Sequence, residues 1–242
     1  MKTKIDFSTR SGSIEIMDDL DCNGEVVDQT LRELDVINHW LGGNNVTLSG
    51  LKELLHDVDL KKIISIVDLG CGSGEMLRII AKQAKRENRN VKLLGLDANP
   101  NITSFAQKHS THFDNIEFEA QNIFSKEFQK RKFDIVLATL FFHHFDDAQL
   151  KDFFIQLKSQ TKIGIVINDI HRHTLAYHSI RLLTKLFSKS KMVKYDAPLS
   201  VLRAFKKQEL IDILAKAGIK NYSLKWKWAF RWQVIVYSDP AK

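Results

Sequence analysis

The pattern of hydrophobic and polar positions divides the chain into three parts. In the middle part, short apolar runs of strand length alternate with longer segments whose apolar positions recur at helical spacing. This alternation predicts a parallel sheet with helices on both faces, because a parallel return needs a long crossover. The expected strands are residues 63–67, 91–96, 116–119, 133–139 and 163–168, and the expected helices are 75–87, 101–112, 124–130 and 147–159.

The first part of the chain shows helical spacing only. Apolar residues recur from Val26 to Leu41 at intervals of three and four, and Gly42-Gly43 predicts the end of this helix. A second, shorter helix is expected at 48–58. Because both helices precede the first strand, we expect residues 1–60 to form a helical lid over a cleft.

The last part begins with helical spacing and ends with two apolar runs. One long helix is expected at 171–191 and another at 205–217, where Gly218 ends it. The runs at 221–228 and 230–237 are separated by too few residues for a crossover. These two strands should therefore pair antiparallel.

The three parts together predict an α/β protein with a seven-stranded, mostly parallel sheet that contains one antiparallel strand. We expect residues 61–242 to form one domain, with a helical substrate cap around residues 170–204. The 242 residues, 44% of them hydrophobic, can bury one sizeable core. The chain starts without an apolar signal-peptide stretch, and no apolar run approaches the ~18 residues of a membrane span. A cytoplasmic protein is therefore expected.

A glycine-rich loop follows the first strand of the middle part. The strand ends in Asp68, and the loop contains Gly70, Gly72 and Gly74 before the next helix. Glycines are needed where a backbone turns sharply and lies flat against a ligand. A dinucleotide fingerprint would have its last glycine at position 75, where this chain has Glu75, and a phosphate-binding P-loop is absent. The loop therefore predicts a cradle for a nucleoside-type cofactor.

A second acid stands at the end of the next strand. The run 91–96 ends in Asp97. A carboxylate at this strand end can accept hydrogen bonds from both hydroxyls of a ribose. The alternative is that Asp97 caps the helix that begins near Asn101.

The segment VDLGCGSG, Val67 to Gly74, resembles motif I of the class I S-adenosylmethionine (SAM) dependent methyltransferases. The resemblance is strong over residues 63–170, and it implies a Rossmann-like fold, SAM as the cofactor and S-adenosylhomocysteine (SAH) as the product. Asn122 stands where the family commonly has an acid that contacts adenine, and its side-chain carbonyl can still accept that hydrogen bond. The positions that the resemblance assigns to the cofactor are Asp68, Gly70, Cys71, Gly72, Gly74, Asp97, Ala98, Asn122, Ile123, Thr139 and Leu140.

Histidines after two strands are candidates for the chemistry. Methyl transfer from a sulfonium requires exclusion of water, alignment of the nucleophile and, for a hydroxyl, removal of its proton. Histidine suits that last task near neutral pH. His143 and His144 follow the fourth strand and resemble the strand-end histidine of small-molecule and quinone-type methyltransferases, whereas His171 and His173 follow the fifth. We rank His144 first and His171 second as the base. The alternative for the first pair is hydrogen bonding to nearby backbone.

Three further residues are candidates for contacts with the acceptor. Tyr177, Arg203 and Phe205 fall in or beside the expected cap, where an aromatic acceptor can stack and an oxyanion can pair with arginine. The alternative for each is a structural role. The segments 10–19, 168–183 and 196–205 resemble a bacterial subgroup of methyltransferases associated with secondary metabolism.

Cysteine content and motifs predict no metal site. Cys22 and Cys71 are too few for a disulfide framework or a thiolate cluster, and the H-E-x-x-H spacing is absent. A site built from the two histidine pairs is geometrically conceivable. The pair Asn168-Asp169 resembles a feature of the metal-dependent catechol methyltransferases, but one such pair is weak evidence for a metal.

The net charge of +7 is concentrated in the C-terminal third. Residues 170–242 contain 15 Lys/Arg and 4 Asp/Glu. A basic face can attract nucleic acid, a membrane surface or an anionic substrate, and the alternative is a solvated surface. No RNA-binding domain, D/N-P-P-Y motif or Pro-Cys nucleophile pair is present, so we expect no stable nucleic-acid partner.

The leading hypothesis is methylation of a small, aromatic or hydroxylated acceptor, on oxygen rather than carbon. An RNA or protein methyltransferase that uses the basic third is the first alternative. A non-catalytic SAM-binding protein is the second. The oligomeric state is not predicted.

Overall fold

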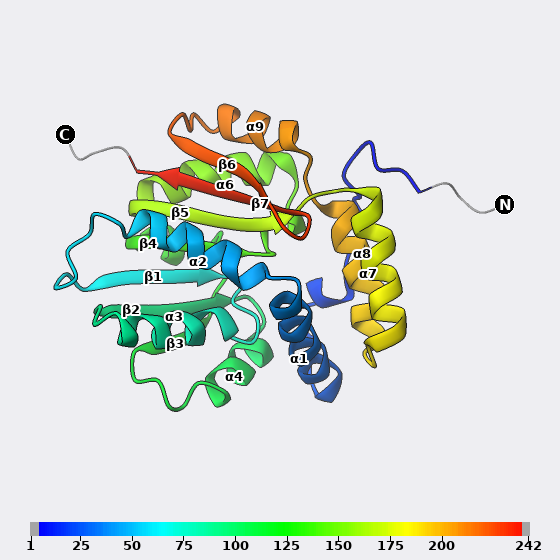
Figure 1. Cartoon of the computed structure of the whole chain (residues 1–242), viewed down its shortest axis with the longest axis horizontal. Helices are drawn as coiled ribbons and strands as arrows, with labels where there is room; N and C mark the ends of the chain where they lie inside the picture. Colours follow the sequence, from blue (N-terminus) through cyan, green and yellow to red (C-terminus); the bar gives the residue numbers. More distant parts are fainter. Residues whose placement is uncertain (1–4, 239–242) are drawn as a thin grey trace.

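The computed structural model describes residues 5–238 and shows a seven-stranded sheet with helices on both faces over that range (Figure 1). The strand order is β3-β2-β1-β4-β5-β7-β6. The first five strands run parallel, and β7 lies antiparallel between β5 and β6. The fold class expected from the sequence is therefore confirmed. The bounds are β1 (Ile64–Leu69), β2 (Val91–Asp97), β3 (Ile116–Ala120), β4 (Phe133–Thr139), β5 (Thr161–Ile170), β6 (Tyr222–Lys227) and β7 (Arg231–Tyr237).

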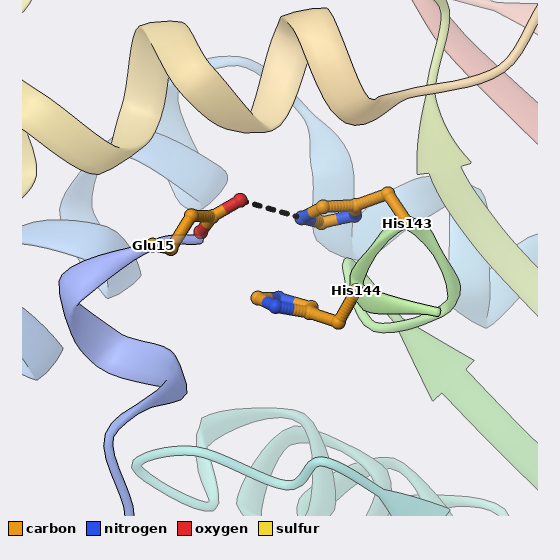
Figure 2. Close-up of side chains that lie close together, drawn as sticks. All are labelled: Glu15, His143 and His144. Carbon is orange, nitrogen blue, oxygen red and sulfur yellow. Dashed lines mark ion pairs between the residues drawn. The ribbon is translucent and has the colours of Figure 1, made fainter. Parts of the chain in front are cut away.

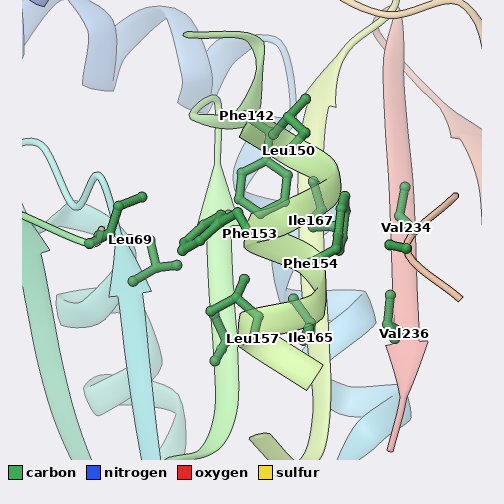
Figure 3. Close-up of a cluster of buried hydrophobic side chains, with 14 of the residues drawn as sticks. Leu69, Phe142, Leu150, Phe153, Phe154, Leu157, Ile165, Ile167, Val234 and Val236 are labelled. Carbon is green, nitrogen blue, oxygen red and sulfur yellow. The ribbon is translucent and has the colours of Figure 1, made fainter. Parts of the chain in front are cut away.

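Both faces of the sheet are buried at its central strands β1 and β4, which is why these strands are largely apolar. Alternate residues of a strand point to opposite faces, so in β1 the side chains of Ile64 and Ile66 join one cluster and those of Val67 and Leu69 another. The first cluster is covered by α2 (Gly43–Leu54) and α3 (Glu75–Arg86). The second is covered by α5 (Lys126–Gln129), α6 (Asp147–Gln160) and α9 (Lys207–Lys216), and Figure 3 shows the side chains of α6 packed against β5.

A further helical layer lies beyond the carboxyl ends of the parallel strands (Figure 1). It contains α1 (Glu25–Trp40), α7 (Thr174–Phe187), α8 (Lys191–Arg203) and the 3-10 turn η1 (Ile16–Asp18). A small apolar cluster ties α1 and α8 to α4 (Pro100–Lys108). A second 3-10 turn, η2 (Phe142–His144), follows β4 and faces this layer. No helix among residues 5–238 is long and apolar enough to cross a membrane.

The helix expected at 171–191 is present but shorter, and a second helix that was not expected follows it. The chain forms two helices, α7 and α8, separated by the segment 188–190. Ser190 begins α8, because its side chain accepts a hydrogen bond from the backbone N–H of Val193 at 3.2 Å. Most of α8 is buried and it contains Pro198, so it lacks both the amphipathic spacing and the composition that identify a helix from sequence.

The N-terminal helices divide between two places. Only α1 and the segment before it lie over the carboxyl ends of the strands, whereas α2 packs on β5 and β7. Gly50 permits this approach, because a Cβ there would lie 2.6 Å from the side chain of Val166. α2 also begins at Gly43, five residues before its expected start at 48. Residues 43–54 therefore belong to the core of the sheet, which corrects the expectation that all of residues 1–60 form a lid.

Candidate active site

A cavity of about 1310 Å³ lies between the carboxyl ends of the strands and the helical layer. Pockets for one drug-sized ligand have volumes of ~300–1,000 Å³, so this cavity has room for a cofactor and a second molecule. It is lined by nearly all the residues that the sequence assigns to a cofactor, namely Asp68, Gly70, Cys71, Gly72, Asp97, Ala98, Asn122, Ile123, Thr139 and Leu140. Gly74 is the exception.

The three loop glycines all have positive φ, and they differ in what surrounds them. A Cβ on Gly70 would lie 2.2 Å from the ring of Phe141, and one on Gly74 would lie 2.6 Å from the ring of Phe118. Both are therefore required for packing. A Cβ on Gly72 (φ +51°) would meet only Leu31, at 3.8 Å, because it would point into the cavity. Gly72 is the glycine that leaves room for a ligand.

We predict that Gly72→Ala weakens cofactor binding while the protein still folds. The added methyl group would occupy ligand space, and overpacking of ~1–3 kcal/mol corresponds to a loss of affinity of about 5- to 150-fold, measured by calorimetry with SAH. Gly218→Ala is the matched control, because Gly218 has φ +70° and no atom within 4 Å of the added Cβ. Both variants place an alanine at positive φ, so equal affinity in the two would contradict this role for Gly72.

Asp97 lies at the end of β2 and faces the cavity. Its Oδ1 accepts a hydrogen bond from the backbone N–H of Asn99 at 3.0 Å. Burial raises the pKa of this carboxyl above its ordinary value. The helix α4 is capped by Asn99, whose side chain accepts from the N–H of Asn101 at 2.8 Å. The alternative that Asp97 serves as the cap of this helix is therefore wrong.

Asp68 is a buried carboxyl at the end of β1. Its side chain is 2% exposed, and its Oδ1 has no hydrogen-bond partner among residues 5–238. Burial, with a smaller contribution from the negative charge of Asp97, raises the pKa of Asp68 to about 8. A buried carboxyl with an unpartnered oxygen in a cavity wall complements a positively charged ligand group.

The two adjacent histidines of η2 also line the cavity (Figure 2). Nδ1 of His143 lies 2.8 Å from Oδ1 of Asp169, and Nδ1 of His144 lies 2.5 Å from Oδ1 of Asp18. The two rings lie 4.3 Å apart, centroid to centroid. Each ring is therefore held at Nδ1 by a carboxylate, which orients the other nitrogen. The alternative of hydrogen bonds from these side chains to nearby backbone is not what the structure shows.

A third group, Glu15, completes this cluster. It is 4% exposed, and its Oε1 lies 3.7 Å from Nε2 of His143. Burial raises the pKa of Glu15 to about 7. Sequence reasoning did not identify Glu15 or Asp18 as site residues. The resemblance of segment 10–19 to a methyltransferase subgroup was the one signal that pointed to this part of the chain.

Two arginines fix the histidine turn in place. Arg203 donates from Nε to the carbonyl of His143 at 3.3 Å and from Nη2 to the carbonyl of His144 at 2.8 Å, and its Nη1 pairs with Asp18. Arg10 donates from Nη2 to the carbonyl of His143 at 3.1 Å. The structure thus gives Arg203 a positioning role. Because Arg203 also lines the cavity, its contact with an acceptor stays a prediction.

The other expected acceptor residues do not line the cavity. Phe205 is fully buried, with the Arg10 guanidinium 4.3 Å from its ring centroid. The ring of Tyr177 packs edge-on against Phe7. Neither side chain is placed to stack on an acceptor, which corrects that expectation.

His171 and His173 also lie outside the cavity lining. β5 continues to Ile170, two residues further than expected, and His171 then forms a bridge with Phe205 and packs on Trp232. His173 caps α7 by accepting a hydrogen bond from the N–H of Leu175 at 3.1 Å. The expectation that either histidine reaches the acceptor is therefore not supported by its position.

Fold and cavity together define a class I SAM-dependent methyltransferase. The chain belongs to the methyltransferase-domain family whose model matches residues 60–223. Among solved structures, the plantazolicin methyltransferase BpumL in complex with SAH aligns with a TM-score of 0.62 and 16% identity over 88% of this chain and 95% of that one. Human N-acetylserotonin methyltransferase in complex with SAM aligns with a TM-score of 0.59 and 18% identity over 89% of this chain and 56% of that one.

Curated relatives match in sequence over about half of this chain. Phosphoethanolamine N-methyltransferase 3 of Arabidopsis thaliana is 31% identical over 130 residues, which are 51% of this chain and 26% of that protein. Phosphoethanolamine N-methyltransferase of Plasmodium falciparum is 27% identical over 119 residues, which are 48% of this chain and 42% of that protein. The chain thus spans less than half the length of either relative.

The residues of the cavity fit SAM. Gly72 leaves open space at the turn, Asp97 offers a carboxylate at the second strand end, and Asp68 has a buried oxygen without a partner. SAM supplies an electrophilic methyl group on a sulfonium, together with an ammonium, and both charges are positive. In this cavity Asp97 would hold the ribose hydroxyls, and Asp68 would face the positively charged methionine part.

Binding of SAM is expected to release a proton from Asp68. In the free protein this carboxyl, with a pKa of about 8, is mostly protonated at neutral pH. A bound cation favours the ionised form, so SAM affinity should rise as the pH increases from about 6 to about 7.5, with nearly one proton released per SAM near pH 7. Calorimetry in buffers of different ionisation enthalpy measures this number. In the Asp68→Asn variant, this proton should no longer be released when SAM binds. The same proton count in the two proteins would contradict the assignment.

Proposed function

We propose that this protein transfers the methyl group of SAM to a hydroxyl oxygen of a small aromatic acceptor. The observation that carries the proposal is the pair His143 and His144, each held by a carboxylate in the wall of the same cavity as the cofactor cradle. A neutral hydroxyl attacks a sulfonium slowly, and a positioned group that assists loss of its proton accelerates the step.

The remaining wall of the cavity suits an aromatic molecule. Phe124, Phe141, Phe145, Trp228 and Phe230 all line it. Aromatic rings stack on one another in offset or edge-on geometry, which would orient a flat acceptor. Enclosure by α1 and α8 would exclude water from the sulfonium and bring the acceptor oxygen into line with the methyl group. We place this reaction in the cytoplasm and, by the resemblance of segments 10–19, 168–183 and 196–205, in secondary metabolism.

A second candidate is an amine acceptor. The identity of 31% with a phosphoethanolamine N-methyltransferase favours it, although the matched residues make up 26% of that relative. Phosphoethanolamine therefore belongs among the compounds to be tested.

The proposal is tested by incubating the protein with SAM labelled in its methyl group. Small hydroxylated aromatic compounds, phosphoethanolamine, RNA and a protein extract are offered separately. Label in the aromatic compounds is the expected result. Label in RNA or protein supports the first alternative given above, and label in phosphoethanolamine supports the second candidate. Binding of SAM without transfer to any of these would indicate a non-catalytic SAM-binding protein.

A further inference from the structure

We propose that Glu15, His143 and His144 form a binding site for a divalent transition-metal ion in the wall of the cavity (Figure 2). The site is independent of the methyl acceptor, and only its chemical use rests on the proposed function. The sequence did not predict this metal site.

The first argument is the convergence of three ligand groups. One ligand atom from each of the three residues lies within 4.8 Å of the other two, and Oε1 of Glu15 lies 3.7 Å from Nε2 of His143. Metal–nitrogen and metal–oxygen bonds of ~2.0–2.2 Å require ligand atoms a little over 3 Å apart. A small inward movement of these side chains is therefore enough to bind an ion.

The second argument is the state of these ligand atoms without an ion. Oε1 of Glu15 is buried and has no hydrogen-bond partner within residues 5–238. The hydrogen bonds to Asp169 and Asp18 occupy Nδ1 of His143 and of His144, so Nε2 of each ring remains for a metal. A buried polar atom without a partner is costly, and a metal ion would supply the missing interaction.

The third argument is the pair of carboxylates behind the histidines. Histidines that bind metals nearly always donate their other ring N–H to a carboxylate, a carbonyl or water, which fixes the ring and strengthens the ligand. Asp169 and Asp18 stand in that position for His143 and His144. Both histidines have such a partner here, which is more than the burial of two polar rings requires.

The fourth argument is charge. Glu15, Asp18 and Asp169 place three carboxylates in or beside the cluster, facing the guanidinium of Arg203 and, at Asp169, that of the buried Arg231. Arg203 approaches Oε1 of Glu15 only to 3.6 Å, because the same Nη1 pairs with Asp18. A divalent cation would interact favourably with the carboxylate of Glu15, which has no close cationic partner of its own.

The ligand set indicates which metals are bound. Two imidazoles and one carboxylate suit Zn²⁺, Fe²⁺, Co²⁺ or Ni²⁺, whereas Mg²⁺ and Ca²⁺ prefer oxygen ligands alone. Three protein ligands leave a coordination position open toward the cavity. An acceptor hydroxyl bound there would lose its proton to solvent more readily. Its oxygen would then form the O–CH₃ bond as the S–CH₃ bond breaks and the sulfur takes the electron pair.

The test is a titration of the metal-free full chain with Zn²⁺, followed by calorimetry. The expected result is one high-affinity Zn²⁺ per chain. Glu15→Gln and His144→Gln should each weaken binding by about 100-fold or more, and Asp18→Asn by about 10- to 100-fold. The matched control is the double variant His171→Gln, His173→Gln, which removes two histidines outside the cavity and should bind Zn²⁺ as the unaltered chain does.

Co²⁺ bound to the unaltered chain provides a second measurement that needs no substitution. Its visible spectrum should show the strong bands of a site with nitrogen and oxygen ligands and low coordination number. Absence of a high-affinity site, binding that survives Glu15→Gln and His144→Gln, or binding lost in the double control variant would each overturn the proposal.

Methyl transfer is assayed separately. Full turnover after metal removal would refute the use of a metal and leave the proposed function intact. Stoichiometric Zn²⁺ binding without methyl transfer to any compound would support the metal site and refute the proposed function.

Discussion

Replacement of His144 by glutamine is expected to lower kcat by about 10²- to 10⁴-fold, the range that a group assisting proton transfer typically contributes. His144 borders the cavity, and Asp18 holds its Nδ1. Glutamine keeps a polar side chain of similar length but is neither a base nor a good metal ligand. The loss is therefore expected whether the ring takes up the proton itself or binds a metal ion that promotes its loss.

The same variant should bind SAM almost as the unaltered chain does, because His144 is expected to touch the acceptor rather than the cofactor. His171→Gln is the matched control, since this histidine packs on Trp232 outside the cavity. It should retain kcat within a few-fold. Near-normal kcat in His144→Gln, measured with saturating acceptor, would show that proton removal at this position does not limit the reaction.

Replacement of Asp97 by alanine is expected to weaken SAM binding by about 10- to 1000-fold. The carboxylate would lose two hydrogen bonds to ribose hydroxyls, each of ~1.5–3 kcal/mol for a charged partner, with partial compensation by water. Gly72 and Asp97 line the same cavity, and the open space beside Gly72 leads us to expect the ribose at the end of β2. Calorimetric titration with SAM and with SAH measures the change.

The control for this variant is Asp212→Ala, which removes an exposed carboxyl on α9. It should leave the affinity for SAM unchanged. The thermal unfolding of Asp97→Ala is compared in parallel to establish that the variant is folded. A folded Asp97→Ala protein with normal SAM affinity would place the ribose elsewhere in the cavity.

The middle of the chain was predictable because its signals are local. The apolar run of β1, the acid at its end and the spacing of Gly70, Gly72 and Gly74 lie within about a dozen residues, and each limits the backbone directly. The same holds for the closing pair β6 and β7, whose short connection allows only antiparallel pairing.

Errors arose where tertiary contacts decide the structure. α8 is buried on most sides and contains Pro198, so it has no polar face that would reveal a helical period. α2 packs on the sheet although it precedes the first strand. The close approach depends on the missing side chain of Gly50, and the sequence does not distinguish this glycine from any other.

The candidate site shows the same division. His143 and His144 were identified because they follow a strand, and strand ends border the cleft in open α/β sheets. The same argument placed His171 and His173 wrongly, because β5 is longer than its apolar run and carries them past the cavity. Glu15 contacts His143, although the two residues are 128 positions apart in the sequence. No local sequence pattern predicts a contact between such distant residues.

The central claim is that this cavity transfers a methyl group from SAM to an oxygen of a small acceptor. The most direct test uses SAM carrying ¹³C in its methyl group and nuclear magnetic resonance of the product, because the ¹³C chemical shift identifies the atom that receives the methyl group. We predict a methyl group bound to oxygen in a small aromatic product, formed by the unaltered chain and nearly absent with His144→Gln. A methyl group bound to nitrogen or carbon, or one found only in RNA or protein, would contradict the account.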